Sequence, residues 1–165
     1  MQERRRNRKA ARFERALARR LTSRTSASLA VIGLSEPGSV GRSAGRVFVG
    51  VDDDGGPPDA VGFAFRAARR RGTGLTVVHA TGPIGRDDLE DAVRIWQLAY
   101  PDVDVRWHVA PGSVDSVVLA ESAGAALTVL GRVRHGLIRQ ALSGSSTYNI
   151  LRLARGPVVL AGGQA

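Results

Sequence analysis

Short apolar runs alternate with helix-patterned segments along most of this chain, and that alternation limits the folds it can adopt. The apolar runs of strand length are 46–52, 75–80, 103–109, 127–130 and 157–160. Strands that alternate with helices through short connections form right-handed crossovers, which make neighbouring strands parallel. We therefore expect the α/β class: an open, five-stranded parallel sheet with helices on both faces.

The helix-patterned segments have recognisable starts and ends. Residues 59–71 carry apolar side chains at helical spacing and finish in an arginine run, and residues 87–100 are acidic in their first turn and stop before Pro101. Ser113 is predicted to cap a short third helix. In the run 103–109, apolar and polar residues alternate, which leaves one face polar and indicates a strand at the edge of the sheet.

The net charge of +9 is concentrated at the N-terminus. Residues 1–24 hold ten of the 24 basic residues and two of the 15 acidic residues, so the rest of the chain is nearly neutral. We divide the chain into a basic tail (1–26), a short β-like run with a linker (27–45) and a folded domain (46–163). A helix over the tail would carry a thin apolar stripe on a basic cylinder. Such a tail suits nucleic acid or an anionic membrane surface, and a solvated extension is the alternative.

Two runs are candidates for the edge of the sheet. Leu29 to Ile32 is β-like and is followed by a linker rich in Ser and Gly, so it either adds an edge strand or packs against the domain surface. The last run, Pro157 to Leu160, is apolar and is also expected at an edge. An apolar edge strand has unpaired backbone groups and must be covered or paired.

Composition excludes several kinds of site. The chain has no cysteine, so it has no disulfide and no thiolate metal site, as is common in a reducing compartment. Its apolar runs are far shorter than the roughly 20 residues that span a bilayer, and its arginine-rich start lacks the apolar core of a secretory signal. We expect a soluble, cytoplasmic protein. His79, His108 and His135 match no hydrolase or zinc pattern, so we expect no catalytic residue and no metal site. We expect no enzyme, with weak nucleotide hydrolysis as the alternative.

The segment from Leu127 to Leu160 has the pattern of an anion site. It contains an apolar run that stops at Gly131, then a loop, then Gly144-Ser145 at the start of a helical pattern, and finally the last apolar run. Glycine lets backbone N–H groups approach a phosphate, and the first N–H groups of a helix have no partner within the helix. We therefore predict a phosphate-sized cradle here.

These residues resemble the nucleotide-binding branch of the universal stress protein family. That branch has glycine, two residues, glycine, nine residues and then glycine with Ser or Thr, between the fourth strand and the last helix. Gly131, Gly144 and Ser145 fit the pattern, and Arg134 stands at the middle glycine. The resemblance covers about residues 46–162. It implies a Rossmann-like sheet with strand order 3-2-1-4-5, a homodimer paired through Pro157 to Leu160, and a regulatory module of the stress response that binds ATP or AMP.

The resemblance also implies which residues bind the nucleotide. The aspartate that ends the first strand holds the nucleoside, the end of the second strand contacts adenine through its backbone, and the glycine loop holds phosphates. By position, the implied ligand-binding residues are Asp52, Ala80, Gly131, Arg134, Gly144, Ser145 and Thr147. The carboxylate of Asp52 suits ribose hydroxyls or an adenine amino group, and a structural cap at the strand end is its alternative role. The implied strand order puts the first and fourth strands together at a switch point, where ligands bind in open α/β sheets.

Two interpretations of Arg134 remain open. Its side chain either fills the space of the phosphate, which gives an interaction module without a nucleotide, or turns outward and pairs with phosphate oxygens. Asp53 and Asp54 would repel a triphosphate unless a divalent cation such as Mg²⁺ lay between them. Nucleotide with Mg²⁺, nucleotide alone and no ligand are thus the alternatives for this loop.

Overall fold

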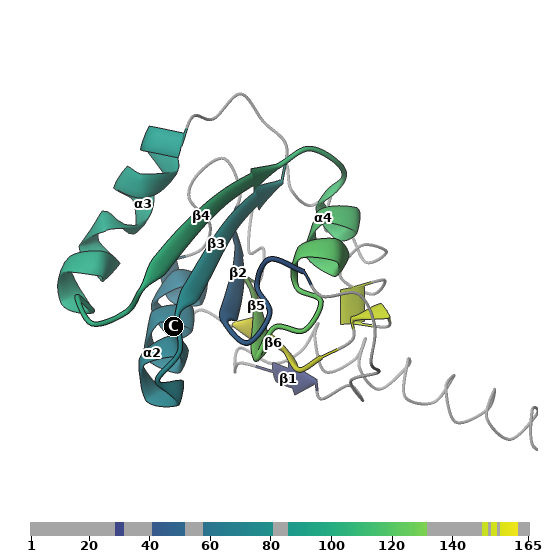
Figure 1. Cartoon of the computed structure of the whole chain (residues 1–165), viewed down its shortest axis with the longest axis horizontal. Helices are drawn as coiled ribbons and strands as arrows, with labels where there is room; N and C mark the ends of the chain where they lie inside the picture. Colours follow the sequence, from purple (N-terminus) through teal and green to yellow (C-terminus); the bar gives the residue numbers. More distant parts are fainter. Residues whose placement is uncertain are drawn as a thin grey trace, which may run out of the picture.

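The computed structural model describes residues 29–31, 41–51, 58–80, 86–131, 150–151, 153–154 and 156–161. At its centre is a six-stranded sheet with the order β1-β6-β5-β2-β3-β4 (Figure 1). The strands are β1 (Leu29–Val31), β2 (Val47–Val51), β3 (Leu75–Ala80), β4 (Val105–Ala110), β5 (Leu127–Gly131) and β6 (Val158–Ala161). The helices are α2 (Pro58–Arg71), α3 (Arg86–Ala99) and α4 (Val114–Glu121).

The five strands from β2 to β6 are parallel and lie in the predicted order. Written from one edge, they run β4-β3-β2-β5-β6, which is the expected 3-2-1-4-5 arrangement. β2 lies in the middle, and its Val49 is paired with Val77 of β3 on one side and with Val129 of β5 on the other. All three side chains are fully buried, as a parallel sheet covered on both faces requires. The predicted fold class is confirmed.

One prediction about the sheet edge is wrong. The last strand, predicted over Pro157 to Leu160, was expected at the edge, but β1 lies outside it and pairs with it antiparallel, with Ala30 opposite Val159. Of the two positions left open for the run 29–32, the structure therefore has the edge strand. The physical reason is that an apolar edge strand leaves N–H and C=O groups unpaired, and a segment from the N-terminal side of the chain pairs with them here.

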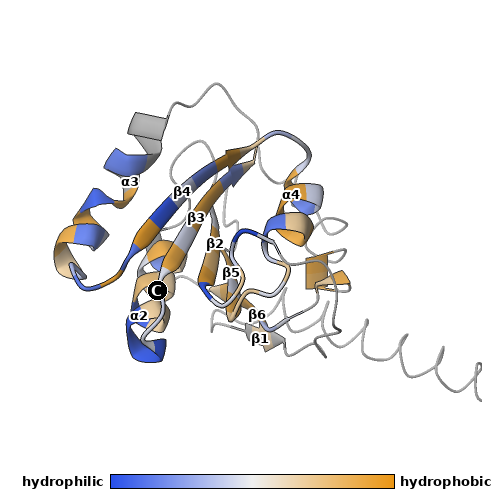
Figure 2. Ribbon diagram, in the orientation of Figure 1, coloured by the Kyte–Doolittle hydropathy of each residue, from blue (hydrophilic) through white to orange (hydrophobic). Residues whose placement is uncertain are grey.

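The opposite edge is as the sequence predicted. β4 ends the sheet, and its Arg106 is exposed while Val105 and Trp107 are half-buried; near its end the alternation of burial is lost, because His108 is half-buried and Val109 is exposed. Figure 2 shows hydrophilic and hydrophobic residues as blue and orange along β4, whereas β2 and β5 are apolar throughout most of their length. A strand with one polar face is suited to an edge because charged side chains discourage pairing with another chain.

The two faces of the sheet carry separate apolar clusters. α2 and α3 cover one face, where Phe65 of α2 is fully buried and Trp96 of α3 is packed beside the buried residues (Figure 1). α4 and Ile150 cover the other face, over Phe48 of β2. Gly62 lies where α2 and α3 approach most closely to the Trp96 side chain, because a Cβ atom there would clash with the Trp96 ring. These clusters hold the strands in register, and so fix where each strand ends.

Candidate functional site

The carboxyl edge of the sheet brings together the ends of three strands. β2 ends at Val51, β3 at Ala80 and β5 at Gly131, and β2 lies between the other two. The chain passes from β2 to β3 on one side, whereas β5 is placed on the other side after β4. The crossover from β2 leads to β3 on one side and the crossover from β4 leads to β5 on the other, and in open α/β sheets such a switch point is where a ligand-binding crevice is expected, above the carboxyl end of β2.

Two of the predicted ligand-binding residues can be placed at this edge. Ala80 is the half-buried last residue of β3 and pairs with Ala110, and Gly131 is the half-buried last residue of β5 and pairs with Ala161. They flank the end of β2 from opposite sides. The other predicted residues lie outside the described residues: Asp52, Arg134, Gly144, Ser145 and Thr147.

His79 fastens the end of β2 to β3. Its side chain is buried, and Nδ1 lies 3.3 Å from the carbonyl oxygen of Val51, the residue before Asp52. A carbonyl oxygen can only accept a hydrogen bond, so in this contact the ring carries its proton on Nδ1. The sequence suggested a structural histidine, and the contact makes it a positioning residue for the crevice. Its location at a strand end was the signal in the sequence.

The loop after β4 also lies at this edge, and the contacts of Ser113 in it differ from the predicted helix cap. Ser113 does precede α4, but its hydroxyl makes no capping bond to the helix backbone. Instead its Oγ donates to Asp115 Oδ1 at 2.7 Å, and Ser116 Oγ donates to the Ser113 carbonyl oxygen at 2.8 Å. Gly112 has φ +135°, a backbone conformation that side-chain-bearing residues rarely adopt. The turn is therefore held by hydroxyl and carboxylate groups of its own residues.

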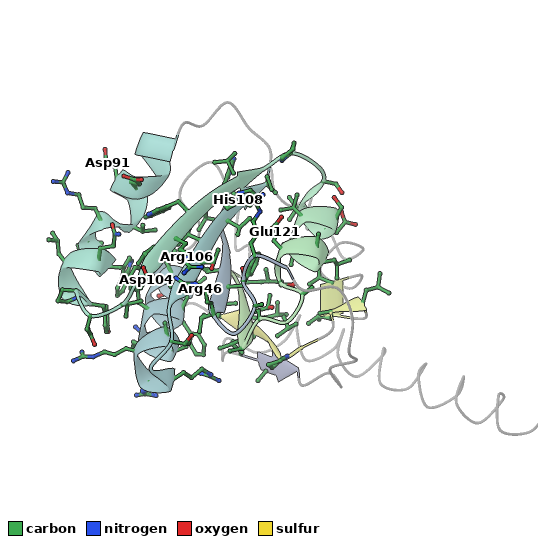
Figure 3. All side chains as sticks on the ribbon, viewed as in Figure 1. Arg46, Asp91, Asp104, Arg106, His108 and Glu121 are labelled. Atoms are coloured by element: carbon green, nitrogen blue, oxygen red, sulfur yellow. The ribbon has the colours of Figure 1, made fainter. Side chains whose placement is uncertain are left out.

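A second polar region lies over β3 and β4, nearer the starts of these strands. It is a hollow of about 340 Å³ lined by Arg42, Thr76, Arg106, Trp107 and His108. Beside it lies the carboxylate of Glu121 in α4, whose Oε1 is 3.5 Å from His108 Nε2 and whose Oε2 is 3.7 Å from Arg42 Nε. Figure 3 shows His108 and Glu121 facing each other. The Glu121 carboxylate offsets part of the positive charge of Arg42 and Arg106, so charges of both signs lie at the hollow. The sequence did not predict it, because Arg42 comes from the linker; the polar face of the run 103–109 was the available signal.

Arg46 forms a bonded cluster at the amino ends of the strands (Figure 3). Its guanidinium donates to the carbonyl oxygens of Leu75 at 2.8 Å and Asp104 at 2.7 Å, and to Thr76 Oγ1 at 3.1 Å. It also forms an ion pair with Asp104 Oδ2 at 2.7 Å. The Arg46 side chain is only 11% exposed, so these contacts tie β2, β3 and the start of β4 together. This cluster supports the sheet from the end opposite the crevice.

The ion pair should make stability depend on acid pH. The hydrogen bond and charge of Arg46 hold the pKa of the Asp104 carboxyl below its usual value. A carboxyl whose pKa is lower in the folded chain adds stability above its unfolded pKa, and this stability is lost as pH falls through the folded pKa. We expect Asp104→Asn to flatten the loss of stability below about pH 4, the ordinary range of an aspartate. Urea unfolding between pH 6 and pH 2.5 measures it; Asp91→Asn, which removes an exposed carboxylate on α3, should keep the wild-type profile.

Among the described residues, no three His, Asp or Glu side chains gather closely enough to hold a metal ion. No helix in the same ranges has the length and apolar character needed to cross a membrane.

The family model and the curated relatives lead to the same family. The model of the universal stress protein family matches residues 84–161. A universal stress protein of Mycobacterium tuberculosis is 34% identical over 131 residues, covering 70% of this chain and 44% of the relative. The chain therefore spans less than half the length of the curated relatives it matches.

Solved structures show the same fold at low sequence identity. A universal stress protein from Archaeoglobus fulgidus superposes with a TM-score of 0.57 and 20% identity, over 71% of this chain and 43% of the other. A universal stress protein crystallised in complex with cAMP gives a TM-score of 0.55 and 23% identity, over 74% of this chain and all of the other. At these identities the similarity establishes the arrangement of strands and helices.

Proposed function

The domain built on this sheet belongs to the universal stress protein family, and on that premise we propose that the crevice at the carboxyl ends of β2, β3 and β5 binds an adenine nucleotide. The observation that carries this proposal is the position of Ala80 and Gly131 on either side of the end of β2. The complex of a similarly folded universal stress protein with cAMP supports the choice of ligand. In this proposal the chain is a regulatory module of the stress response and performs no turnover chemistry.

Each residue of the crevice has a proposed contact. The backbone at Ala80 faces the adenine ring, and the carboxylate of Asp52 accepts hydrogen bonds from the ribose. The amides around Gly131, Gly144 and Ser145 hold the phosphates, because helix-start and glycine-loop N–H groups are suited to anions. Thr147 adds a hydroxyl at the same helix start. His79 assists indirectly by holding the strand end that leads into Asp52.

Loss of Asp52 should weaken nucleotide binding at least tenfold. A hydrogen bond to a charged group contributes about 1.5–3 kcal/mol, and about 1.4 kcal/mol corresponds to a factor of ten. Calorimetry with ATP, AMP and cAMP, each with and without Mg²⁺, measures the dissociation constants of wild type and Asp52→Ala. Asp59→Ala is the matched control, because it removes the same charge from an exposed position on α2. Absence of binding by the wild type to all three nucleotides would exclude the proposed function.

The same titration separates the two interpretations of Arg134. If its guanidinium pairs with phosphate, Arg134→Gly weakens the binding of ATP more than that of AMP, because ATP offers more phosphate oxygens. If its stem fills the crevice, the same change strengthens both. The second result would favour the alternative function, a non-nucleotide interaction module of the same fold.

The proposed module acts as a homodimer in the cytoplasm, as the family resemblance implies. The basic segment 1–24 supplies a further proposed contact with nucleic acid or an anionic surface. In the structure β1 pairs with β6, the strand through which the resemblance implies that the dimer forms.

A further inference from the structure

The polar hollow over β3 and β4 lies on the face of the sheet that α4 covers. In the β3–β4 ladder Arg106 is opposite Thr76, and His108 is opposite Val78, which belongs to the apolar cluster beneath α4. Alternate residues of a strand share a face, so these four side chains lie on the α4 side. Trp107, between the two polar residues of β4, packs against the cluster on the α2 side. The floor of the hollow is therefore formed by polar side chains of β3 and β4.

The two arginines of the hollow have hydrogen-bond donors that the fold does not use. Arg42 Nε lies 3.7 Å from Glu121 Oε2, and Arg106 Nε lies 3.8 Å from Asp104 Oδ2. Both distances are longer than a hydrogen bond, and Asp104 Oδ2 already accepts one from Arg46 at 2.7 Å. Among the described residues, neither Arg42 nor Arg106 has a hydrogen-bonded acceptor. Two exposed guanidinium groups thus line the hollow with N–H groups available to a ligand.

A buried hydroxyl in the floor of the hollow also has a donor to offer. Thr76 is only 2% exposed, and its Oγ1 accepts a hydrogen bond from Arg46 Nε at 3.1 Å. A hydroxyl accepts and donates at the same time, and within the described part of the chain the hydrogen of this hydroxyl has no acceptor. A buried donor without an acceptor costs free energy, which an oxygen atom of a ligand would recover. Thr76 therefore favours a ligand that presents oxygen atoms.

We propose that this hollow binds a single phosphate group, either as inorganic phosphate or as the phosphate of a small monoester. The guanidinium groups of Arg42 and Arg106 pair with phosphate oxygens, because their planar forks match phosphate geometry. The Thr76 hydroxyl donates to another oxygen. The hollow, at about 340 Å³, is at the lower end of the roughly 300–1,000 Å³ that is usual for small-molecule sites. This site is separate from the crevice at the carboxyl ends of the strands and does not rest on the function proposed there.

The neighbouring carboxylates limit how much negative charge the ligand carries. Glu121 lies beside His108 and Arg42, and Asp104 lies beside Arg106 and Arg46, so each arginine of the hollow already has a carboxylate near it (Figure 3). Like charges repel, so these two carboxylates oppose a chain of several phosphates. One phosphate group is the better match, with polar groups such as hydroxyls on the rest of the molecule to donate to the carboxylates.

The histidine rings of this chain show where phosphate binds. His108 lines the hollow, whereas His79 contacts the Val51 carbonyl oxygen at the carboxyl edge of the sheet. Inorganic phosphate and glycerol 3-phosphate are titrated separately into the 165-residue chain while NMR follows the ring signals of its three histidines. The pH is held constant, because protonation also moves these signals, and sodium chloride at matched ionic strength gives the baseline. We expect a saturable shift of the His108 signal, and the probe with the lower dissociation constant identifies the source of the phosphate.

Removing both guanidinium groups tests their role in the site. The double variant Arg42→Gln with Arg106→Gln should raise the dissociation constant of the better probe, measured from the His108 signal, by about tenfold or more, because charge-assisted hydrogen bonds are lost. Both side chains are exposed, so the substitutions leave the core intact. Arg66→Gln with Arg70→Gln is the matched control, because it removes the same charge from exposed positions on α2, across the sheet. This control should keep the wild-type dissociation constant.

Three results would overturn the proposed phosphate site. The first is the absence of a saturable His108 shift with either probe, and the second is an equal dissociation constant in the two double variants. The third is a shift confined to His79. That result would place the phosphate at the carboxyl edge, so the function proposed for the crevice would stand while the hollow would be excluded.

Discussion

Replacing Phe65 with alanine is expected to lower the free energy of unfolding by about 3–5 kcal/mol, the usual range for loss of a buried aromatic side chain. Phe65 is fully buried in the cluster between α2, α3 and the sheet, and its ring centroid lies 5.9 Å from that of Tyr100. Small domains have only about 5–15 kcal/mol of stability, so this loss would remove a large share of it. Urea unfolding followed by circular dichroism measures it.

Two further substitutions show whether burial is the cause. Phe63→Ala changes the same residue type on the same helix, but Phe63 is only partly buried, so it should cost clearly less. Phe65→Leu keeps a large apolar side chain in the cluster and should cost less than Phe65→Ala, because it removes less buried volume. Equal losses for Phe65→Ala and Phe63→Ala would contradict the placement of Phe65 at the centre of the cluster.

Replacing Arg46 with methionine should have the second large effect, a loss of about 2–3 kcal/mol, because hydrogen bonds from charged groups contribute more than neutral ones. Methionine fills similar volume but cannot donate, so the carbonyl oxygens of Leu75 and Asp104 lose their guanidinium partner. The variant should also lose the acid dependence ascribed to Asp104, because Arg46 is the main cause of its lowered pKa. Urea unfolding at pH 7 and at pH 3 tests both expectations with the same samples.

Arg94→Met is the matched control for Arg46→Met. Arg94 and Asp91 form an ion pair at 3.6 Å, and both side chains are about three-quarters exposed, 74% and 77%. Exposed pairs of this kind contribute about 0–1 kcal/mol, so the control should stay near wild type. A loss as large as that of Arg46→Met would mean that removal of any arginine destabilises the chain, and would contradict a specific role for the cluster at the amino ends.

The element boundaries were largely predictable because they depend on local periodicity. The predicted helices 59–71 and 87–100 correspond within a residue to α2 and α3. The alternating run 103–109 was correctly placed at an edge, since a polar face on a strand signals partial exposure. Membership of the family followed from the spacing of Gly131, Gly144 and Ser145, and the comparisons confirm it.

The candidate site was predictable only as a list of positions. Ala80 and Gly131 do end the strands that flank β2, because the ends of parallel strands in register meet at one edge. The contact of His79 with the Val51 carbonyl oxygen was not foreseeable, since it depends on the register between two strands. Whether Arg134 supports or blocks a phosphate stays a prediction for the titrations above.

The sequence alone determined the α/β class and where strands and helices begin and end. Apolar residues recur at the spacing of a strand or of a helix, and this spacing can be seen in the sequence. Only the tertiary structure decided that β1 pairs with β6 and that Arg46 reaches Asp104, 58 residues further along the chain. The physical reason is that an unpaired strand edge or a guanidinium group can form hydrogen bonds with many different segments of the chain, because carbonyl and carboxylate oxygens occur throughout it. The partner that they meet is set by which segments the folded core brings within bonding distance.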